Sequence, residues 1–230
     1  MTTTTADKVF DYRTLRLLIG LIAFSLPFVA DMLASIPIAS ISASYYTDAR
    51  DAFVGMLFVV GAFLWAYNGH TPKQRRASKI ASIAAICIAL FPTSCELCGA
   101  SIIPDSCISC ETSYISVIHY ISAGLLFSIL AYFCLGPFRE KTKGQPGQKG
   151  RRGHVYFVCG WVMVICIVAA LAANFILSEE AAKAWKVTYW AEAVAMCAFG
   201  IAWFVAGKWL IFVDKEDAIK LFTKAESKTN

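Results

Sequence analysis

From Pro37 to Gly55 the chain reads Pro-Ile-Ala-Ser-Ile-Ser-Ala-Ser-Tyr-Tyr-Thr-Asp-Ala-Arg-Asp-Ala-Phe-Val-Gly, a polar stretch between two long apolar runs. Serines occupy three alternate positions, Ser40, Ser42 and Ser44, and tyrosines, a threonine, two aspartates and an arginine follow them. Polar and charged side chains are costly in a membrane and usually face a bundle interior or a water-filled cavity. A polar site is therefore expected where this stretch joins two buried segments.

The composition is that of a membrane protein. Of the 230 residues, 58% are hydrophobic and only 16% are charged, and the mean hydropathy is +0.59. The charges gather in short segments between apolar runs of about 15 to 25 residues, the length that crosses a hydrocarbon core of roughly 30 Å. A membrane β-barrel would show short alternating segments instead. The sequence therefore predicts an all-α polytopic membrane protein, a six-transmembrane-helix bundle.

The apolar runs predict one transmembrane domain over residues 1–212, followed by a charged tail over 213–230. The first run continues through Pro27 without a small-residue cleavage site, so we expect it to be retained as a span. Three connections stand out: a basic loop at 68–79, a flexible Gly- and Lys-rich linker at 136–153 and an acidic turn at 178–186. The six spans are predicted at about 17–34, 52–67, 80–92, 114–135, 154–177 and 188–212.

Charge predicts the orientation of the spans. All but three of the 21 Lys and Arg residues fall in segments on the same side as the termini, the exceptions being Arg50, Lys183 and Lys186. Because cytoplasmic loops carry an excess of Lys and Arg, both termini are predicted to be cytoplasmic. The location predicted is an integral membrane position, in the inner (plasma) membrane of a bacterium. The net charge of +5 is a topology signal, and no nucleic-acid partner is predicted because no folded domain carries a basic face.

The outer ends of the spans bring polar residues from distant parts of the chain to one face. Tyr46, Arg50 and Glu192 are the predicted ligand-binding residues of an outer-leaflet polar pocket. We also predict that Arg50 pairs with Glu192, because a guanidinium can hold a carboxylate or a lipid phosphate in a two-pronged contact. The alternative is that the polar residues only cap helix ends, with Thr47 or Asp48 as the N-cap of the second span.

A catalytic site is a second interpretation of the same face. The candidate catalytic residues are His119 as general base with Ser42, Ser44, Asp48 and Asp51, the side-chain types that activate a hydroxyl nucleophile. No G-x-S-x-G motif accompanies them. A single histidine on a helix can equally be a hydrogen-bonded structural residue, and this alternative stays open.

Four cysteines lie in the loop between the third and fourth spans. They form two C-x₂-C pairs, Cys95 with Cys98 and Cys107 with Cys110, separated by eight residues. In a cytosolic protein this arrangement would indicate zinc, but an extracytoplasmic loop favours two disulfides. A metal site and an exchanging redox pair remain alternatives, the connectivity is undetermined, and neither a metal nor a cofactor is predicted.

The stretch Ser40–Gly55, together with Phe91-Pro-Thr and Ile118-His119-Tyr120, resembles a family of uncharacterised bacterial six-span membrane proteins. The chain is more remotely similar to the group that contains the autophagy-modulator membrane proteins and the eukaryotic proteins of GPI-anchor lipid remodelling. The likeness covers about residues 15–210 and implies six spans and membrane lipids as partners, without an established reaction. The cysteine loop is not part of it.

These observations leave three functional hypotheses. The first is a membrane protein that binds a lipid headgroup or a small ligand in the outer pocket without catalysis. The second is an intramembrane lipid hydrolase or acyltransferase in which His119 works with a serine and an aspartate of residues 40–51. The third is an extracytoplasmic thiol-redox protein. The sequence predicts no oligomeric state.

Overall fold

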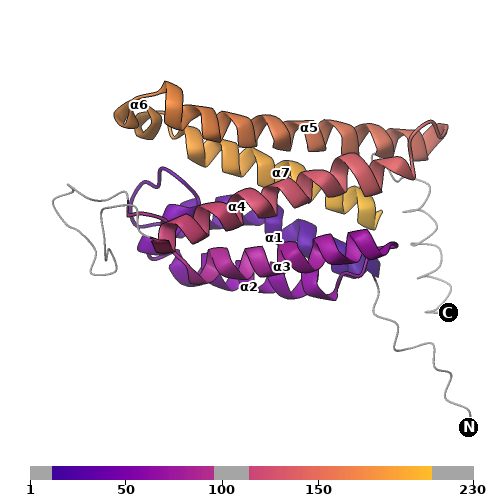
Figure 1. Cartoon of the computed structure of the whole chain (residues 1–230), viewed down its shortest axis with the longest axis horizontal. Helices are drawn as coiled ribbons and strands as arrows, with labels where there is room; N and C mark the ends of the chain where they lie inside the picture. Colours follow the sequence, from indigo (N-terminus) through magenta and orange to yellow (C-terminus); the bar gives the residue numbers. More distant parts are fainter. Residues whose placement is uncertain (1–11, 96–113, 209–230) are drawn as a thin grey trace, which may run out of the picture.

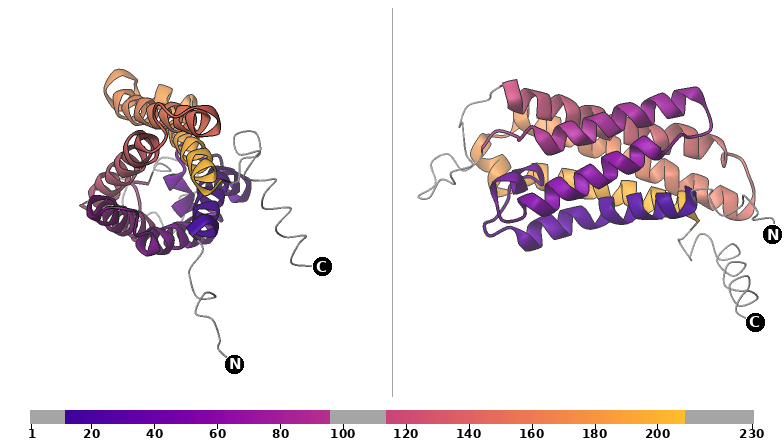
Figure 2. Two further views of the ribbon diagram at one scale, coloured as in Figure 1. Left: turned by 90° about the vertical axis from the view of Figure 1, so that its right-hand side faces the viewer. Right: turned by 90° about the horizontal axis from the view of Figure 1, so that it is seen from below.

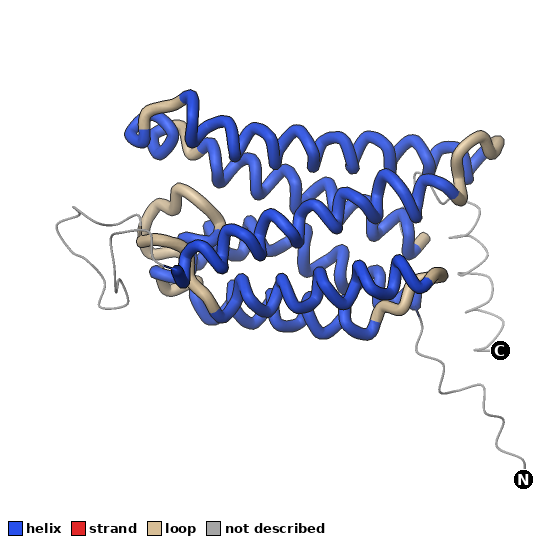
Figure 3. The backbone as a smooth tube through the Cα atoms, in the orientation of Figure 1, coloured by secondary structure: helices blue, strands red, loops and turns tan. Residues whose placement is uncertain are grey.

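The computed structural model describes residues 12–95 and 114–208. All regular secondary structure in these two segments is helical, with no strand (Figure 3). The elements in chain order are α1 (Tyr12–Leu33), the 3₁₀ helix η2 (Ser42–Tyr46), α2 (Arg50–Ala66), α3 (Pro72–Leu90), α4 (Tyr114–Phe133), the π-helical turn η3 (Cys134–Phe138), α5 (Gly147–Ile176), α6 (Glu179–Ala184) and α7 (Val187–Gly207).

The long helices lie side by side, with their axes roughly along the long axis of the molecule (Figure 1). Contacts join α1 to α2 and α7, α3 to α2 and α4, and α5 to α4 and α7, so the six long helices form a closed ring when viewed end-on (Figure 2). One end of the bundle, here called the terminal end, is where α1 begins and α7 ends. At the opposite end, here called the loop end, α1 ends and α7 begins.

The predicted basic loop at 68–79 is wrong over most of its length, because α3 begins at Pro72. Thr71 is the N-cap of α3, and its hydroxyl accepts a hydrogen bond from the Gln74 amide at 3.2 Å. Proline is well tolerated in the first helical turn, so Thr-Pro is a helix start. Most of the basic residues of this segment therefore lie on a helix instead of in a loop.

The predicted flexible linker at 136–153 and the acidic turn at 178–186 are also shorter than expected. The π-helical turn η3 extends α4 to Phe138, and α5 begins at Gly147, within the predicted linker. In the acidic segment Ser178 caps the short helix α6 by accepting a hydrogen bond from the Ala181 amide. The predicted tail, 213–230, lies outside the described residues.

Within the described residues, four helices are long and apolar enough to cross a membrane, over Arg13–Leu33, Tyr114–Phe138, Gly147–Ala173 and Val187–Gly207. The other two members of the ring are less apolar or shorter: α2 has 17 residues, and the first half of α3 carries the basic residues described above. Large apolar side chains point outward from α5, with Ile165, Val168 and Leu171 between 58% and 63% exposed. An exposed apolar band of this kind is typical of a lipid-facing helix.

Small residues allow α1 and α7 to approach closely. A Cβ atom added at Gly200 of α7 would lie 2.8 Å from the Gly20 carbonyl oxygen and 2.8 Å from Cβ of Phe24, both in α1. Small residues at helix crossings are typical of membrane bundles, where close backbone packing replaces the hydrophobic effect. This crossing fixes the two helices whose loop-end termini support the candidate site.

Candidate functional site

The polar stretch that follows α1 folds into a short 3₁₀ helix across the loop end of the bundle. The Ser40 hydroxyl accepts a hydrogen bond from the Ala43 amide at 3.1 Å, and the Ser44 amide donates to the Ile41 carbonyl at 3.1 Å. The first bond is of the kind that a serine hydroxyl offers at a turn, and the second is a backbone bond of the 3₁₀ helix. They hold η2 in place between α1 and α2 with its serines buried.

Helix α7 anchors this stretch through two hydrogen bonds. The Glu192 carboxylate accepts a bond from the Ile41 amide at 2.6 Å, and the Tyr189 amide donates to the Ala39 carbonyl at 3.0 Å. The second bond satisfies an amide in the first turn of α7 that has no partner within the helix. Glu192 is therefore a residue that positions the stretch.

His119 of α4 connects η2 to the end of α3. Its Nε2 lies 3.0 Å from Oγ of Ser42, and its Nδ1 lies 2.7 Å from the carbonyl oxygen of Phe91. The imidazole is only 2% exposed. The structure thus brings together two of the predicted catalytic residues, although they are 77 positions apart in the sequence.

The partners of His119 determine how a neutral ring is protonated. A carbonyl oxygen only accepts hydrogen bonds, so Nδ1 carries the proton and donates it to Phe91. Nε2 then accepts a hydrogen bond from the Ser42 hydroxyl, which is the orientation of a serine and its general base. In the serine hydrolases a carboxylate holds the base, whereas here a backbone carbonyl does.

Tyr46 extends the polar network toward the cysteine loop. Its hydroxyl donates to the Thr93 carbonyl at 2.5 Å, and the Thr93 hydroxyl donates to the Tyr120 hydroxyl at 3.0 Å. Burial raises the pKa of Tyr46, and the neighbouring Tyr45 and Tyr120 raise it further. Tyr46 therefore stays a neutral hydrogen-bond donor, and it links η2 to the segment after α3.

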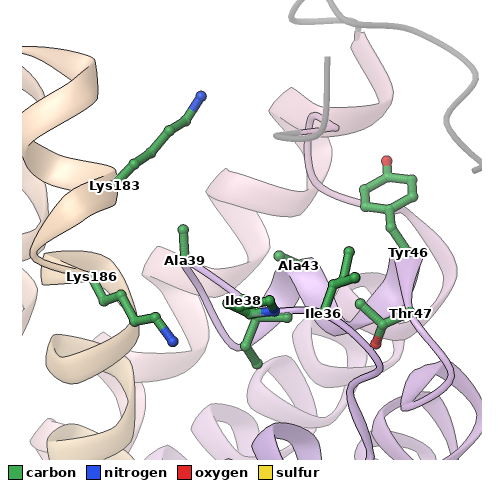
Figure 4. Close-up of a pocket in the computed structure, with 9 residues that line it drawn as sticks. Ile36, Ile38, Ala39, Ala43, Tyr46, Thr47, Lys183 and Lys186 are labelled. Carbon is green, nitrogen blue, oxygen red and sulfur yellow. The ribbon is translucent and has the colours of Figure 1, made fainter. Parts of the chain in front are cut away.

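A pocket of about 230 Å³ opens beside η2. Its floor is formed mainly by apolar side chains of the stretch, and Lys183 of α6 and Lys186 at the start of α7 stand across from them (Figure 4). Lys183 is exposed and Lys186 half-buried. The described residues that line it are Ile36, Pro37, Ile38, Ala39, Ala43, Tyr46, Thr47, Lys183 and Lys186.

The structure separates the predicted carboxylates from the serine and histidine. Asp48 and Asp51 are exposed near the start of α2, while Ser44 is fully buried in η2. The Ser44 hydroxyl has no hydrogen-bond partner among the described residues. Of the aspartates and serines predicted as partners of His119, Ser42 is the one in contact with it.

The predicted pairing of Arg50 with Glu192 is wrong, because each side chain has a different partner. The Arg50 guanidinium donates to the Tyr45 hydroxyl at 3.0 Å and lies 4.4 Å from the centre of the Tyr45 ring. Glu192 binds the amide of Ile41. Of the three predicted ligand-binding residues, only Tyr46 lines the pocket.

The predicted N-cap of the second span is also wrong. Ala49 is the N-cap of α2 and makes no side-chain cap hydrogen bond. Thr47 instead accepts a hydrogen bond from the Ala49 amide and donates to the Ser44 carbonyl, so it stabilises the turn between η2 and α2. The polar residues here are not explained by helix capping alone.

Sequence reasoning missed the two lysines of the pocket. Lys183 and Lys186 are two of the three basic residues that do not fall on the side of the termini. Their departure from the charge bias was the feature of the sequence that could have indicated a functional role for these two lysines. It could not be connected to η2 without knowing that α6 and α7 begin beside the stretch.

Cys95 is the one cysteine of the four-cysteine loop that the structure describes. It is buried and disulfide-bonded. Cys98, Cys107 and Cys110 lie outside the described residues, so the connectivity and the metal and redox alternatives remain untested predictions. Among residues 12–95 and 114–208 no group of three His, Cys, Asp or Glu side chains could hold a metal ion.

Comparison of the chain with protein-family models, curated proteins and solved structures finds no match. The resemblance to the bacterial six-span family therefore stays a prediction. Function is therefore inferred from the geometry of the site.

Proposed function

We propose that the chain is a six-span inner-membrane protein of a bacterium that binds an anionic lipid headgroup, without catalysis, in the pocket at the loop end. The observation that carries this proposal is the pair of lysines, Lys183 and Lys186, across an apolar floor. Phosphate-bearing lipids combine the same two chemistries, an anionic group and attached apolar chains. In this proposal the loop end lies outside the cytoplasm and both termini lie inside it.

The ring of helices supports the proposal of six spans. Although α2 is shorter than the other helices of the ring and α3 is more polar, they pack between α1 and α4 in the same alternating order. Four helices of the ring are long and apolar enough to cross a membrane, and the packing of α2 and α3 among them supports a membrane position for these two as well. The basic residues, gathered at the terminal end apart from Arg50, Lys183 and Lys186, support a cytoplasmic terminal end.

The topology predicts opposite accessibility for the two ends. In variants that carry a single cysteine, an impermeant thiol reagent added to intact cells is expected to label Ala100→Cys and to leave Gln145→Cys unlabelled. Labelling of Gln145→Cys should appear once the membrane is permeabilised, which controls for a buried thiol. Labelling of Gln145→Cys in intact cells would reverse the proposed orientation.

The size of the pocket favours a headgroup over a complete lipid. Pockets for drug-sized ligands hold roughly 300 to 1,000 Å³, and this one holds about 230 Å³. A phosphate between Lys183 and Lys186 would form charge-assisted hydrogen bonds, which are about twice as strong as neutral ones. The glycerol and acyl chains would then extend past the apolar residues at the end of α1 toward the bilayer.

Lysine removal tests the binding. Phosphatidylglycerol added to the detergent-solubilised protein is expected to raise the midpoint of thermal unfolding by several degrees, because a ligand that binds only the folded state stabilises it. Phosphatidylcholine with the same acyl chains is expected to have a much smaller effect. The double variant Lys183→Gln/Lys186→Gln should lose most of the difference.

The matched control is Arg50→Gln. Arg50 is an exposed cation at the same end of the bundle, but it does not line the pocket. This variant should respond to phosphatidylglycerol as the wild type does. An equal loss in Arg50→Gln and the double lysine variant would show general charge attraction and would overturn the pocket.

The hydrogen bond between Ser42 and His119 supports a second candidate function, acyl transfer or lipid hydrolysis. In this reaction Oγ of Ser42 would attack an acyl carbonyl while its proton passes to Nε2 of His119, and the leaving alcohol would take that proton. The arrangement has the required geometry, but His119 is buried and neither residue lines the pocket. This burial is why binding without catalysis is the first proposal.

A covalent probe separates the two functions. If the dyad is catalytic, a fluorophosphonate should label the wild type in membranes, and Ser42→Ala and His119→Gln should each abolish the labelling. Ser44→Ala is the control, because Ser44 lies in the same 3₁₀ helix without contacting His119. We expect no labelling of the wild type, and labelling that depends on Ser42 would replace our first proposal with the second.

A further inference from the structure

A second pocket lies at the terminal end of the bundle, far from the loop end. It has a volume of about 120 Å³ and is formed by residues of α1, α3, α5, α7 and the segment around η3. Two arginines, two lysines and one histidine are among the described residues that line it: Arg16, Arg152, Lys141, Lys208 and His70. None of the described residues that line it is acidic.

Arg16 is held at the pocket by fixed partners. Its Nη1 donates to the Ala206 carbonyl at 2.8 Å, near the end of α7, and its Nη2 donates to the Tyr67 hydroxyl at 3.4 Å. The guanidinium also lies over the rings of Tyr67 and Phe138, at 5.6 and 6.0 Å from their centres. Its buried Nε has no hydrogen-bond partner among the described residues, although an unpaired buried donor is costly.

The neutral part of the lining adds hydrogen-bonding groups and a favourable helix end. Gln74, in the first turn of α3, lines the pocket, and the amide of His70 donates to its side-chain oxygen at 2.8 Å. The N-terminus of α3 carries partial positive charge, which adds to the charge of the basic residues, while the end of α7, whose Ala206 carbonyl is bonded to Arg16, carries partial negative charge. Arg152, only 8% exposed, brings a second guanidinium from α5.

We propose that the terminal-end pocket binds a phosphate group, carried either by the headgroup of an anionic phospholipid or by a free phosphorylated small molecule. Two guanidiniums and two ammonium groups around a small cavity match a phosphate, which accepts several charge-assisted hydrogen bonds at once. The unpaired Nε of Arg16 supplies a donor that the protein itself leaves unused. The site is separate from the loop-end pocket and does not depend on its function.

The titration of Lys141 agrees with this charge arrangement. Lys141 is an exposed residue, but partial desolvation beside the pocket lowers the pKa of its ammonium group, and the positive charge of Arg16 lowers it further. The protein therefore holds two cations against their mutual repulsion in this pocket. A bound phosphate would relieve that repulsion and raise the pKa of Lys141 again, since a nearby anion favours the charged form.

The experiment compares two neighbouring lysines in the full chain. Lys141 lines the pocket and Lys143 does not, yet both are exposed in the same segment between η3 and α5. Lys141→Gln and Lys143→Gln therefore remove the same charge from nearly the same place. Because Lys141 is exposed, both variants should fold, and their unfolding midpoints without ligand check this.

Two arms separate the sources of phosphate. In the first, purified protein in detergent is titrated with inorganic phosphate at constant ionic strength, with chloride as the reference, and the shift in unfolding midpoint gives the affinity. In the second, nanodiscs containing phosphatidic acid are compared with nanodiscs of phosphatidylcholine alone. The variant Lys183→Gln/Lys186→Gln is included in both arms, so that binding at the loop end can be recognised and subtracted.

We expect Lys141→Gln to weaken binding about tenfold, the effect of one lost charge-assisted contact, and Lys143→Gln to change it less than twofold. Binding of inorganic phosphate that depends on Lys141 identifies a free phosphorylated ligand. An effect of phosphatidic acid alone that depends on Lys141 identifies a lipid headgroup. Absence of binding in both arms, or equal effects of Lys141→Gln and Lys143→Gln, overturns the proposal.

Discussion

Replacing His119 with leucine is expected to lower the free energy of unfolding by about 2–4 kcal/mol, because two buried hydrogen-bonding partners lose their bonds at once. The Ser42 hydroxyl and the Phe91 carbonyl both depend on the imidazole, which is almost fully buried. Equilibrium unfolding of the purified protein in mixed micelles with increasing denaturing detergent, followed by tryptophan fluorescence, measures the change.

The size of this effect has a structural origin. His119 joins three segments, the end of α3, η2 and α4, at the loop end of the bundle. Ser42→Ala removes only one of its two bonds, so about 1 kcal/mol is expected for it. In the His119→Leu background Ser42→Ala should cost much less, because the bond is already absent.

The control for His119→Leu is His154→Leu. His154 is exposed on α5, and its replacement should leave the unfolding free energy within about 0.5 kcal/mol of the wild type. Equal stability of His119→Leu and the wild type would show that the imidazole does not hold η2 in place. The interpretation that His119 fixes the arrangement of the loop end would then be contradicted.

Gly200→Val is the second substitution with a large expected effect, a loss of about 3 kcal/mol. A Cβ atom at this position would lie 2.8 Å from the backbone oxygen of Gly20, and backbone atoms cannot move aside as a flexible side chain can. Adding carbon atoms to a closely packed site typically costs about 1–3 kcal/mol, and the branched valine adds two further methyl groups. The crossing of α1 and α7 should open, and the loop-end pocket between their termini should be disturbed with it.

Gly55→Val is the matched control for this substitution. Gly55 is also a helical glycine, in α2, but an added Cβ there has no atom within 4 Å. Its replacement should leave the free energy of unfolding close to that of the wild type. The same unfolding experiment in mixed micelles measures both glycine variants. A tolerated Gly200→Val would mean that α1 and α7 do not cross as closely as described.

The sequence was sufficient to predict an all-helical membrane protein, because its apolar runs have the length of membrane-spanning helices. Helix starts were less predictable. Thr71-Pro72 is a local signal for the start of α3, but the polar residues that follow it were interpreted as a loop. Gly147 starts α5 without a side-chain cap, so no local signal marks it.

The candidate site was predicted in part. Ser42 and His119 were both identified from the sequence, and the structure places them in contact. The sequence alone could not exclude Asp48 and Asp51 as catalytic partners of His119, because the rotation of α2 about its axis depends on packing against α1 and α3. The same uncertainty led to the wrong partner for Arg50, whose guanidinium lies on Tyr45.

No pattern in the sequence predicts the terminal-end pocket. Its basic residues come from four separate parts of the chain, and at the level of sequence each one contributes only to the orientation signal. They become a site because the ring closes α1, α5 and α7 around them. Basic residues that set the orientation of the spans can therefore also line a binding pocket.

The most direct test of the proposed function is native mass spectrometry of the protein released from bacterial membranes. The wild type and Arg50→Gln are predicted to retain one anionic phospholipid that Lys183→Gln/Lys186→Gln has lost. Lys141→Gln is included so that a lipid held at the terminal end can be distinguished. Retention of the same anionic lipid by the wild type and by Lys183→Gln/Lys186→Gln would contradict a headgroup site at the loop end.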